Sequence, residues 1–295
     1  MILKMRSAFF RKFLDSPGKL VSSDTSGSKK DFKYEWVTKV DEDGTWGLVA
    51  ASSQEKTATA YDSIFAEYQT ETFSNLLHAM YTKPYEILEA REVIELTEMA
   101  DYYCALPIVS ATIGFPISIA GGKIDIQYYC VNMIMPAFKL RHRHLFRECV
   151  VYLAGNWDPT DEVDSPSWDQ KVKNVVIKAR ERIRLQIEKV HEIILKLSAE
   201  YPFVAQALSE VQPYAGHPLP NYYRRLKTAI EEGTPASEFR DILYKLHYSM
   251  NPLLHNCLQF PAHYCQAGED YYENYFLCAK VEGNDVPWDI TQSDW

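Results

Sequence analysis

The residues best suited to chemistry are two His-x-Cys pairs near the C-terminal end of the sequence. They are His255 with Cys257 and His263 with Cys265, and five residues separate the two pairs. Imidazole nitrogen and thiolate sulfur are zinc ligands, and four such ligands close a structural zinc site. Paired zinc ligands are usually about two to four residues apart, whereas one residue separates each pair here. Buried thiols and half-exposed histidines are therefore the favoured interpretation, with zinc as the alternative.

Two other sets of residues could carry chemistry, and each has a simpler structural interpretation. Cys104 has no histidine near it in the sequence to lower the pKa of its thiol, so we expect a core thiol at the end of a helix. His142 and His144 alternate with arginines. On a helix, residues two apart point to different faces, so we expect solvated basic side chains rather than a shared metal.

The sequence contains none of the motifs that mark common catalytic or nucleotide-binding sites. It has no P-loop, GxGxxG turn, GxSxG elbow or HExxH zinc motif. We therefore predict a protein that is not an enzyme, with no catalytic residues and no cofactor. An enzyme with a zinc or thiol site near Cys257 and His263 is the alternative that the residue types leave open.

The charge distribution argues against a nucleic-acid surface. The chain of 295 residues carries a formal net charge of −9, and phosphate binding depends on clustered lysine and arginine. Charge is nevertheless uneven. Residues 171–196 contain eight Lys or Arg against three Glu, and residues 269–294 contain seven acids against one Lys. We favour two solvated faces of opposite sign over an ion-paired contact between the acidic tail and the basic segment.

The sequence also indicates an intracellular protein, cytoplasmic or nuclear. Its six cysteines include no CxxC pair, it has no Asn-x-Ser/Thr site, and residues 1–15 lack the apolar core of a signal peptide. Residues 102–122 form an uncharged run of 21 residues, but two prolines and three glycines interrupt it. A buried helix followed by a connector is therefore predicted there, and no membrane partner is expected.

Toward the N-terminal end, the pattern predicts a strand hairpin and then helices. Residues 32–40 begin with aromatic residues alternating with charged ones, as on a half-buried strand, and an Asp-Glu-Asp-Gly turn leads to a second candidate strand over 45–51. A helix is expected to start at Thr72, which would cap it, and to bury one stripe of side chains. That stripe consists of Phe73, Leu76, Leu77, Met80 and Tyr81.

Beyond residue 122 the sequence predicts helices alone. Residues 169–197 place nine apolar side chains at helical spacing, which predicts one long helix. Two shorter helices are expected over 220–232 and 236–248. The last 45 residues are expected to be irregular because they are rich in Tyr, Asn and Pro.

Several segments of the sequence resemble BTB/POZ-domain proteins of filamentous fungi. RSAFFRKFLDSP is similar to the BTB helix in which a serine precedes paired aromatics, and TFSNLLHAMYTKPY and VIELTEMADYYCALPIVS resemble later helical segments of that domain. The likeness continues in KLRHRHLFRECVVYLAGNW, and in YFLCAKV and VPWDITQSDW near the end. It covers nearly the whole chain, and the combination of middle and end motifs carries it most specifically.

The resemblance implies an α+β fold in two parts. Residues 1–115 would form a BTB/POZ-like domain with a short sheet and helices, and residues 116–295 a mostly α-helical region with an irregular acidic tail. BTB domains normally open with a strand pair that this sequence lacks before Arg6, so we expect an N-terminally truncated domain. The sheet would then have fewer strands, and the hairpin would cover its edge.

The resemblance also implies a non-enzymatic protein–protein interaction module. The expected partners are proteins, through self-association or a cullin, and not nucleic acid or membrane. The candidate interaction surface consists of Phe73, Leu77, Tyr81 and Tyr85. Some BTB proteins are substrate adaptors of cullin-based ubiquitin ligases, and this role is the alternative that the resemblance offers.

Overall fold

The structure is a computed structural model that describes residues 2–14, 36–40, 46–50, 63–120, 123–157, 165–211, 218–235, 239–260 and 265–292. Its N-terminal helices are α1 (Ile2–Arg6), α2 (Ala8–Leu14), α3 (Ser63–Met80), α4 (Ala90–Tyr102), α5 (Leu106–Thr112) and α6 (Gly114–Ala120). Helix α4 packs against α3 and α5. It buries Val93, Leu96 and Ala100 at helical spacing, which is why this amphipathic stretch folds as a helix.

Helix α3 is longer than the sequence pattern predicted. It begins at Ser63, so Thr72 lies in its middle and does not cap its start. Thr72 is buried, and its hydroxyl donates a hydrogen bond of 3.4 Å to Oε2 of Glu95 on α4. A threonine within a helix can thus satisfy its hydroxyl on a neighbouring helix, and the expected start at this residue was wrong.

A strand hairpin precedes α3. Strands β1 (Trp36–Val40) and β2 (Trp46–Ala50) pair antiparallel, with Trp36 opposite Ala50 and Val40 opposite Trp46. No third strand joins them in the described part of the chain. The predicted α+β fold, a BTB/POZ-like domain built on a short sheet, is therefore wrong, and the fold is all-helical apart from this hairpin. A two-stranded hairpin has marginal stability by itself, so contacts between helices form the core.

Helices α7 (Ile126–Lys139) and α8 (Arg143–Gly155) form the centre of the molecule. They pack against each other, while α4 contacts α7 and the next long helix contacts α8. Every residue from Glu148 to Gly155 is buried, as expected for a helix that has neighbours on all sides. The centre of the fold thus joins the N-terminal helices to the C-terminal ones.

Helix α9 (Gln170–Glu200) is the longest element, with 31 residues. At 1.5 Å per residue its length is about 46 Å. The side chain of Asp169 caps its start by accepting a hydrogen bond from the backbone N–H of Lys171. Eight apolar side chains on one face are buried, from Val172 to Leu197. The single long helix predicted from the nine apolar residues is confirmed.

Helices α10 (Pro202–Glu210), α11 (Leu219–Gly233) and α12 (Phe239–Leu254) complete a bundle with α9. Helix α9 contacts α10 and α12, and α11 contacts the same two, so the four helices enclose one core. The sequence pattern predicted α11 and α12 but missed α10. That helix has nine residues and begins at a proline, which is tolerated in the first turn of a helix.

The C-terminal segment is irregular, as predicted, and contains two short 3-10 turns, η4 (Asp270–Tyr272) and η5 (Gly283–Asp285). Asp285 forms ion pairs with two cations of α9, Lys178 at 2.7 Å and Arg182 at 2.8 Å. The expectation of two separately solvated faces was therefore wrong at this position. The side chain of Asp285 is 9% exposed, so the tail is tied to the basic helix through a largely buried carboxylate.

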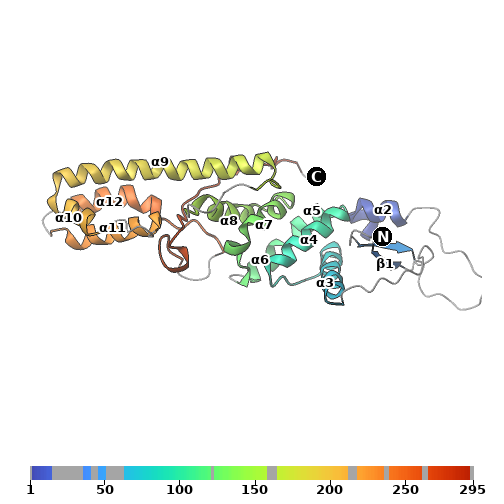
Figure 1. Ribbon diagram of the computed structural model, residues 1–295. Coiled ribbons are helices and arrows are strands. Elements are labelled where there is room, and N and C mark those ends of the chain that lie inside the picture. Colours follow the sequence, from blue (N-terminus) through green and yellow to red (C-terminus); the bar gives the residue numbers. More distant parts are fainter. Residues whose placement is uncertain are drawn as a thin grey trace, which may run out of the picture.

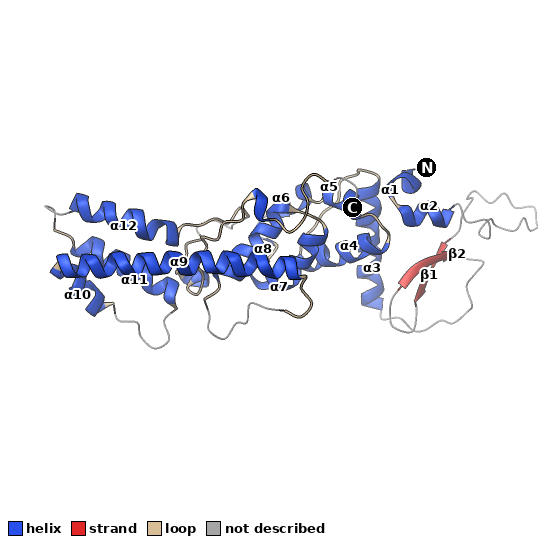
Figure 2. Cartoon of the chain, turned by 90° about the horizontal axis from the view of Figure 1, so that it is seen from above, coloured by secondary structure: helices blue, strands red, loops and turns tan. Residues whose placement is uncertain are grey.

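The described chain is elongated. Helices α1 to α6 lie toward one end, the bundle of α9 to α12 lies at the other, and α7 and α8 lie between them (Figure 1). Seen from above, α9 runs along both the bundle and the central helices (Figure 2).

None of the described helices is both long enough and apolar enough to span a bilayer. The uncharged run 102–122 contains α5 and α6, where a single helix and a connector were expected.

Three helices end in a left-handed residue that is not glycine. Thr82, Cys104 and Arg141 follow α3, α4 and α7 with φ angles of 54°, 50° and 50°. In each case the next N–H donates to a carbonyl five residues back, for example from Lys83 to His78 at 2.8 Å. This closes the helix in the way that glycine usually permits, and side chains with a Cβ adopt it less readily.

Candidate functional site

The four residues predicted as an interaction surface do not form one exposed patch. Phe73 and Leu77 are half-buried on α3. Tyr85 is 8% exposed, its hydroxyl lies 3.0 Å from Oγ1 of Thr112, and burial raises its pKa to about 12. Of the four, Tyr81 alone is exposed. These side chains mainly pack α3 against the helices around it.

Aromatic side chains join α2 to the end of α4. Tyr103 is buried, and its ring stacks on Phe10 with centroids 5.3 Å apart and an angle of 2° between the planes. The ring of Phe9 meets Tyr103 edge-on at 4.9 Å. The hydroxyl of Ser7 donates a hydrogen bond of 2.6 Å to the carbonyl of Tyr103. The serine and paired aromatics that carried part of the family resemblance therefore have a packing role in this chain.

The proposed zinc ligands occupy different environments. His255 is exposed just after α12, and Cys257 is buried. Cys265 is half-buried, and its Sγ donates to the hydroxyl of Tyr272 at 3.2 Å. His263 lies outside the described residues. Among the residues that are described, no group of three His, Cys, Asp or Glu side chains is arranged to hold a metal ion.

Two further sequence interpretations need correction. Cys104 is at a helix end, as predicted, but it is exposed rather than in the core, because the chain turns outward in the left-handed conformation there. His142 is not a solvated basic residue. Its Nδ1 accepts a hydrogen bond of 3.2 Å from the N–H of Leu145 and so caps α8. Burial lowers its pKa to about 4, which keeps this histidine neutral at pH 7.

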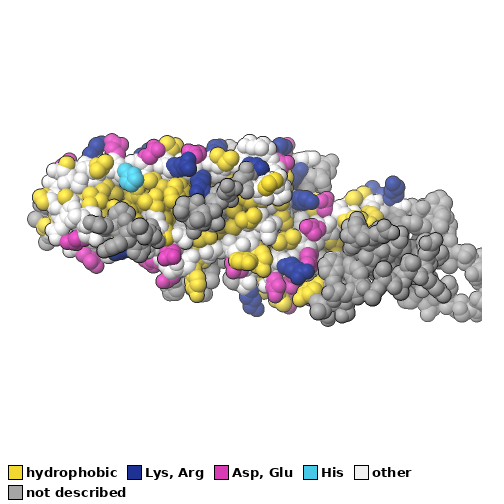
Figure 3. Space-filling model, viewed as in Figure 1, with side chains coloured by type: hydrophobic (Ala, Val, Ile, Leu, Met, Phe, Trp, Pro, Cys, Tyr) yellow, Lys and Arg dark blue, Asp and Glu magenta, His cyan; other side chains and the backbone are white. Residues whose placement is uncertain are grey.

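A groove between α9 and α12 is the candidate functional site. Two adjoining cavities, of about 350 and 560 Å3, share Tyr248 and Pro252 in their walls. We call the combined surface the α9–α12 groove. Its lining residues are Arg182, Leu185, Gln186, Lys189, Ile193, His247, Tyr248, Ser249, Asn251, Pro252, His255 and Lys280. Hydrophobic side chains are gathered on this end of the molecule below α9 (Figure 3).

The apolar part of the groove comes from side chains outside the buried faces of the two helices. Leu185 of α9 is 56% exposed, and Tyr248 of α12 is 77% exposed. Tyr244, one turn before Tyr248, is also exposed, and the two rings stack with centroids 6.5 Å apart. Large exposed apolar side chains that lie together usually mark a surface that binds another molecule.

A proline interrupts the regular backbone hydrogen bonding of the helix that forms one wall of the groove. Pro252 lies inside α12, and proline has no N–H to donate to the carbonyl four residues earlier. That carbonyl belongs to Tyr248, and it therefore lacks its usual helical donor. The side chain of Ser249 bonds to the carbonyls of Lys245 at 2.9 Å and Leu246 at 3.2 Å.

Basic side chains line the groove, and in the part of the chain that the structure describes none of its lining residues is a carboxylate. Arg182 is paired with Asp285, and hydrogen bonds from Arg182 and Lys178 hold the pKa of that carboxyl well below its usual range. Lys189 forms no ion pair with a carboxylate of the described residues. Lys280 adds a third cation from the C-terminal segment. The groove therefore combines apolar side chains with positive charge in a chain whose net charge is −9.

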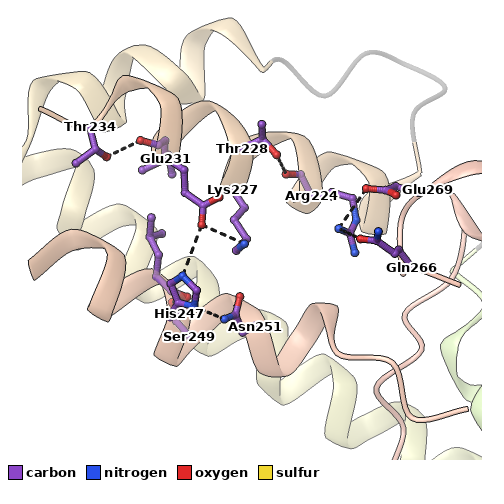
Figure 4. A network of polar contacts seen from close by, with 12 residues as sticks. Arg224, Lys227, Thr228, Glu231, Thr234, His247, Ser249, Asn251, Gln266 and Glu269 are labelled. Carbon is purple, nitrogen blue, oxygen red and sulfur yellow. Dashed lines mark hydrogen bonds and ion pairs between the residues drawn. The ribbon is translucent and has the colours of Figure 1, made fainter. Parts of the chain in front are cut away.

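A polar network fixes α12 to α11 behind the groove (Figure 4). Glu231 of α11 accepts from Lys227 at 3.0 Å and lies 3.9 Å from Nε2 of His247 on α12. The side chain of Asn251 bonds to Nδ1 of His247. His247 is thus oriented from both sides, so one wall of the groove is held in place before any ligand binds.

The same network continues to the C-terminal segment. Arg224 of α11 donates to the carbonyl of Ala267 at 2.6 Å and to Oε1 of Gln266 at 2.7 Å, and it pairs with Glu269 at 3.2 Å. These contacts hold residues 265–269 against the bundle.

Comparisons with known proteins found no relative of this chain. No protein-family model matches it, and neither curated proteins nor solved structures provide a match.

Proposed function

We propose that the protein is a non-enzymatic protein–protein interaction module whose α9–α12 groove binds an acidic, partly apolar segment of a partner protein. One observation carries the proposal: the groove presents exposed apolar side chains beside three cations, of which Arg182 is paired with Asp285, and none of the described lining residues is a carboxylate. An acidic segment complements this charge, and its apolar residues would cover Leu185 and Tyr248.

The expected energies suit a specific interaction of moderate strength. Burying one large apolar side chain contributes roughly 1.5–3 kcal/mol, and Leu185, Ile193 and Tyr248 are available for it. Lys189 and Lys280 would act mainly on the rate of association and on the choice of partner, since exposed charges steer encounters. The carbonyl of Tyr248, which receives no N–H from Pro252, would accept one backbone hydrogen bond from a chain in the groove.

An interaction role agrees with what the family resemblance implies, although the surface differs from the one predicted on α3. The adaptor role for a cullin-based ligase, the BTB/POZ resemblance itself and the domain boundary at residues 115 and 116 stay predictions.

The proposal is tested by selecting ligands for the full chain from a displayed library of random 12-residue peptides. We expect the selected peptides to combine Asp or Glu with Leu, Phe or Trp. Their binding, followed by fluorescence polarisation, should weaken as salt is raised, because the ion pairs are exposed. Selection of peptides without acidic residues would contradict the proposal.

Charge reversal in the groove provides the matched test. Lys189→Glu should weaken the selected peptides about ten-fold or more, since it removes one attraction and adds one repulsion. Lys171→Glu is the control, because it makes the same charge change in the first turn of the same helix, about 27 Å away, where an acid is tolerated. Equal effects of the two substitutions would show that only the net charge of the protein matters.

A further inference from the structure

A second cavity, of about 410 Å3, lies where the start of α7, the end of α8 and the η4 segment meet. We call it the tyrosine pocket. Its lining residues are Asp125, Gln127, Tyr128, Cys130, Val131, Tyr152, Leu153, Asn156, Tyr271 and Tyr275. It shares no residue with the α9–α12 groove, and the inference drawn from it does not depend on the proposed function.

The floor of the tyrosine pocket is rigid. Tyr152 is 6% exposed, and its ring stacks on Tyr272 at 6.4 Å and meets Tyr275 edge-on at 6.0 Å. Such pairs of aromatic rings stabilise one another in these geometries. Burial raises the pKa of Tyr152 far above its usual value, so this phenol is neutral. The floor therefore presents an aromatic surface that does not rearrange easily.

Backbone contacts between distant segments hold the walls together. The N–H of Phe276 donates to the carbonyl of Gly155 at 2.8 Å, and Trp157 donates to Asn274 at 2.8 Å. A Cβ at Gly155 would lie 1.9 Å from the carbonyl oxygen of Phe276, so this close approach requires glycine. The side chain of Gln127 donates to the carbonyl of Tyr271 at 3.2 Å, which fixes the η4 segment on α7.

The open side of the pocket carries two more rings. Tyr128 and Tyr271 are 76% and 88% exposed. Four of the ten lining residues are therefore tyrosines, and they come from α7, α8 and the η4 segment. An exposed tyrosine by itself is unremarkable on a surface, but here tyrosines from three segments line one cavity.

The charge of the tyrosine pocket is negative. Among the described residues that line the pocket, Asp125 is the one that carries a charge, and its Oδ1 also caps α7 by accepting from the N–H of Tyr128 at 2.9 Å. That cap offsets the positive end of the α7 dipole, which would favour an anion. The negative end of the α8 dipole reaches the pocket at Asn156. Together with the electron-rich ring faces, this favours a cation.

We propose that the tyrosine pocket binds a quaternary ammonium group, either free or on a trimethylated lysine side chain. Aromatic rings beside one carboxylate suit a large, weakly hydrated cation, which gains from the ring faces and needs no hydrogen-bond acceptors. A primary ammonium is strongly hydrated and would lose more on entering an aromatic pocket. The guanidinium of arginine would need acceptors for five N–H groups, and Asp125 is the single carboxylate in the lining.

The test compares choline with its neutral isostere 3,3-dimethyl-1-butanol, using the full chain and calorimetry. The two probes have nearly the same shape, and only choline is charged. We expect choline to bind with a dissociation constant on the order of 1 mM and the isostere to bind at least about five-fold more weakly. Equal binding of the two probes, or no binding of choline at several times that concentration, would overturn the proposal.

Two variants locate the site. Tyr128→Leu should weaken choline about two- to five-fold, as expected for loss of one exposed ring, whereas Tyr128→Phe should bind as the unmodified protein does. Tyr244→Leu is the control, since this tyrosine is similarly exposed, at 72%, but lies by the groove. An equal loss in the control would overturn the assignment.

A trimethyllysine peptide distinguishes the two sources of the quaternary ammonium group. Tighter binding of the peptide than of choline would identify the source as a protein, and the reverse order would identify the free cation.

Discussion

The α9–α12 groove and the tyrosine pocket are two concave surfaces of one chain with opposite chemistry. Among the described lining residues, the groove has three cations and no carboxylate, while the pocket has one carboxylate and no Lys or Arg. Both are rich in exposed aromatic or aliphatic side chains. The net charge of −9 describes neither of them. Local charge is therefore the better guide to what each surface binds.

The two regions also differ in how they are built. The groove lies between the faces of two helices, so its side chains are placed by regular helix geometry. The pocket depends on main-chain contacts between the end of α8 and residues 274–276, which lie more than a hundred positions further along the chain. Substitutions in the backbone junction should therefore affect the pocket far more than the groove.

The largest expected effect tests this junction. Gly155→Ala should destabilise the protein by about 3 kcal/mol or more, because the new Cβ would overlap a main-chain oxygen and the backbone would have to move. Urea denaturation measures the change in the free energy of unfolding. Gly233→Ala is the control, since nothing lies within 4 Å of its Cβ position. Equal stability of the two variants would show that the junction is looser than described.

The buried carboxylate of Glu148 joins α8 to the segment that follows α12, and its contribution to stability depends on pH. This carboxylate of α8 is 1% exposed and accepts from the N–H of Gln259, in the segment that follows the groove wall. Burial raises its pKa from 4.5 to about 6. The folded state therefore binds this proton more tightly than the unfolded state. The resulting stability is fully present below about pH 4.5 and is lost as the pH rises through 6.

The Glu148→Gln variant isolates this contribution. Between pH 4.5 and 6, the free energy of unfolding of the unmodified protein should fall by roughly 2 kcal/mol relative to that of the variant. The amide oxygen can still accept from Gln259, so the contact to the segment after α12 is kept. Chemical denaturation at several pH values measures the slope. An unchanged slope in the variant would show that another group titrates in this range.

A smaller effect is expected from Asp285→Asn, which changes the charge beside the groove and leaves the charge of the tyrosine pocket as it is. The substitution releases Arg182 and Lys178 from their shared carboxylate. We expect acidic peptides to bind the groove about two- to three-fold more tightly and choline binding to stay the same. Stability above pH 4 should fall by about 1 kcal/mol, because the partner cations are largely solvated. Parallel titrations of both ligands provide the measurement, and a matching change in choline binding would contradict the separation.

The smallest effect should leave both surfaces unchanged. Thr82 ends α3 with a φ of 54°, a conformation that a β-branched residue adopts at a cost. Thr82→Gly should raise the free energy of unfolding by up to about 1 kcal/mol without altering either ligand titration. Thr82→Ala separates the causes: if it stabilises as much as glycine does, the branched side chain of Thr82, and not the presence of a Cβ at this backbone angle, is responsible.

The sequence allowed the helices to be predicted better than their contacts. Helix α9 could be predicted because eight buried side chains repeat at helical spacing, and α10 was missed because nine residues hold too little of that repeat. The α+β prediction followed from resemblance and from one hairpin, whereas a sheet requires further strands to pair with it. No local pattern reports whether such partners exist.

The candidate surfaces could be predicted from the sequence only in part. Tyr244 and Tyr248 are one helical turn apart and fall outside the buried stripe of α12, a spacing that predicts a shared exposed face. The contact of α12 with α9 could not be read from that spacing. The tyrosine pocket could not be predicted from the sequence, because it depends on contacts between distant residues, such as the bond from Gln127 to Tyr271 across 144 positions. Cys104 was misplaced because its exposure follows from a backbone angle and not from its residue type.

The length of α9 has a consequence for any ligand that carries two binding groups. The helix contains neither glycine nor proline in its 31 residues. It borders the groove along its middle, from Arg182 to Ile193, and it also packs on α8, which ends at the tyrosine pocket. The helix therefore fixes the distance between the two surfaces. For a bivalent ligand, the effective concentration at the second site would be set almost wholly by its own linker. Avidity would then rise sharply when the linker matches the fixed span, and a shorter linker would gain nothing.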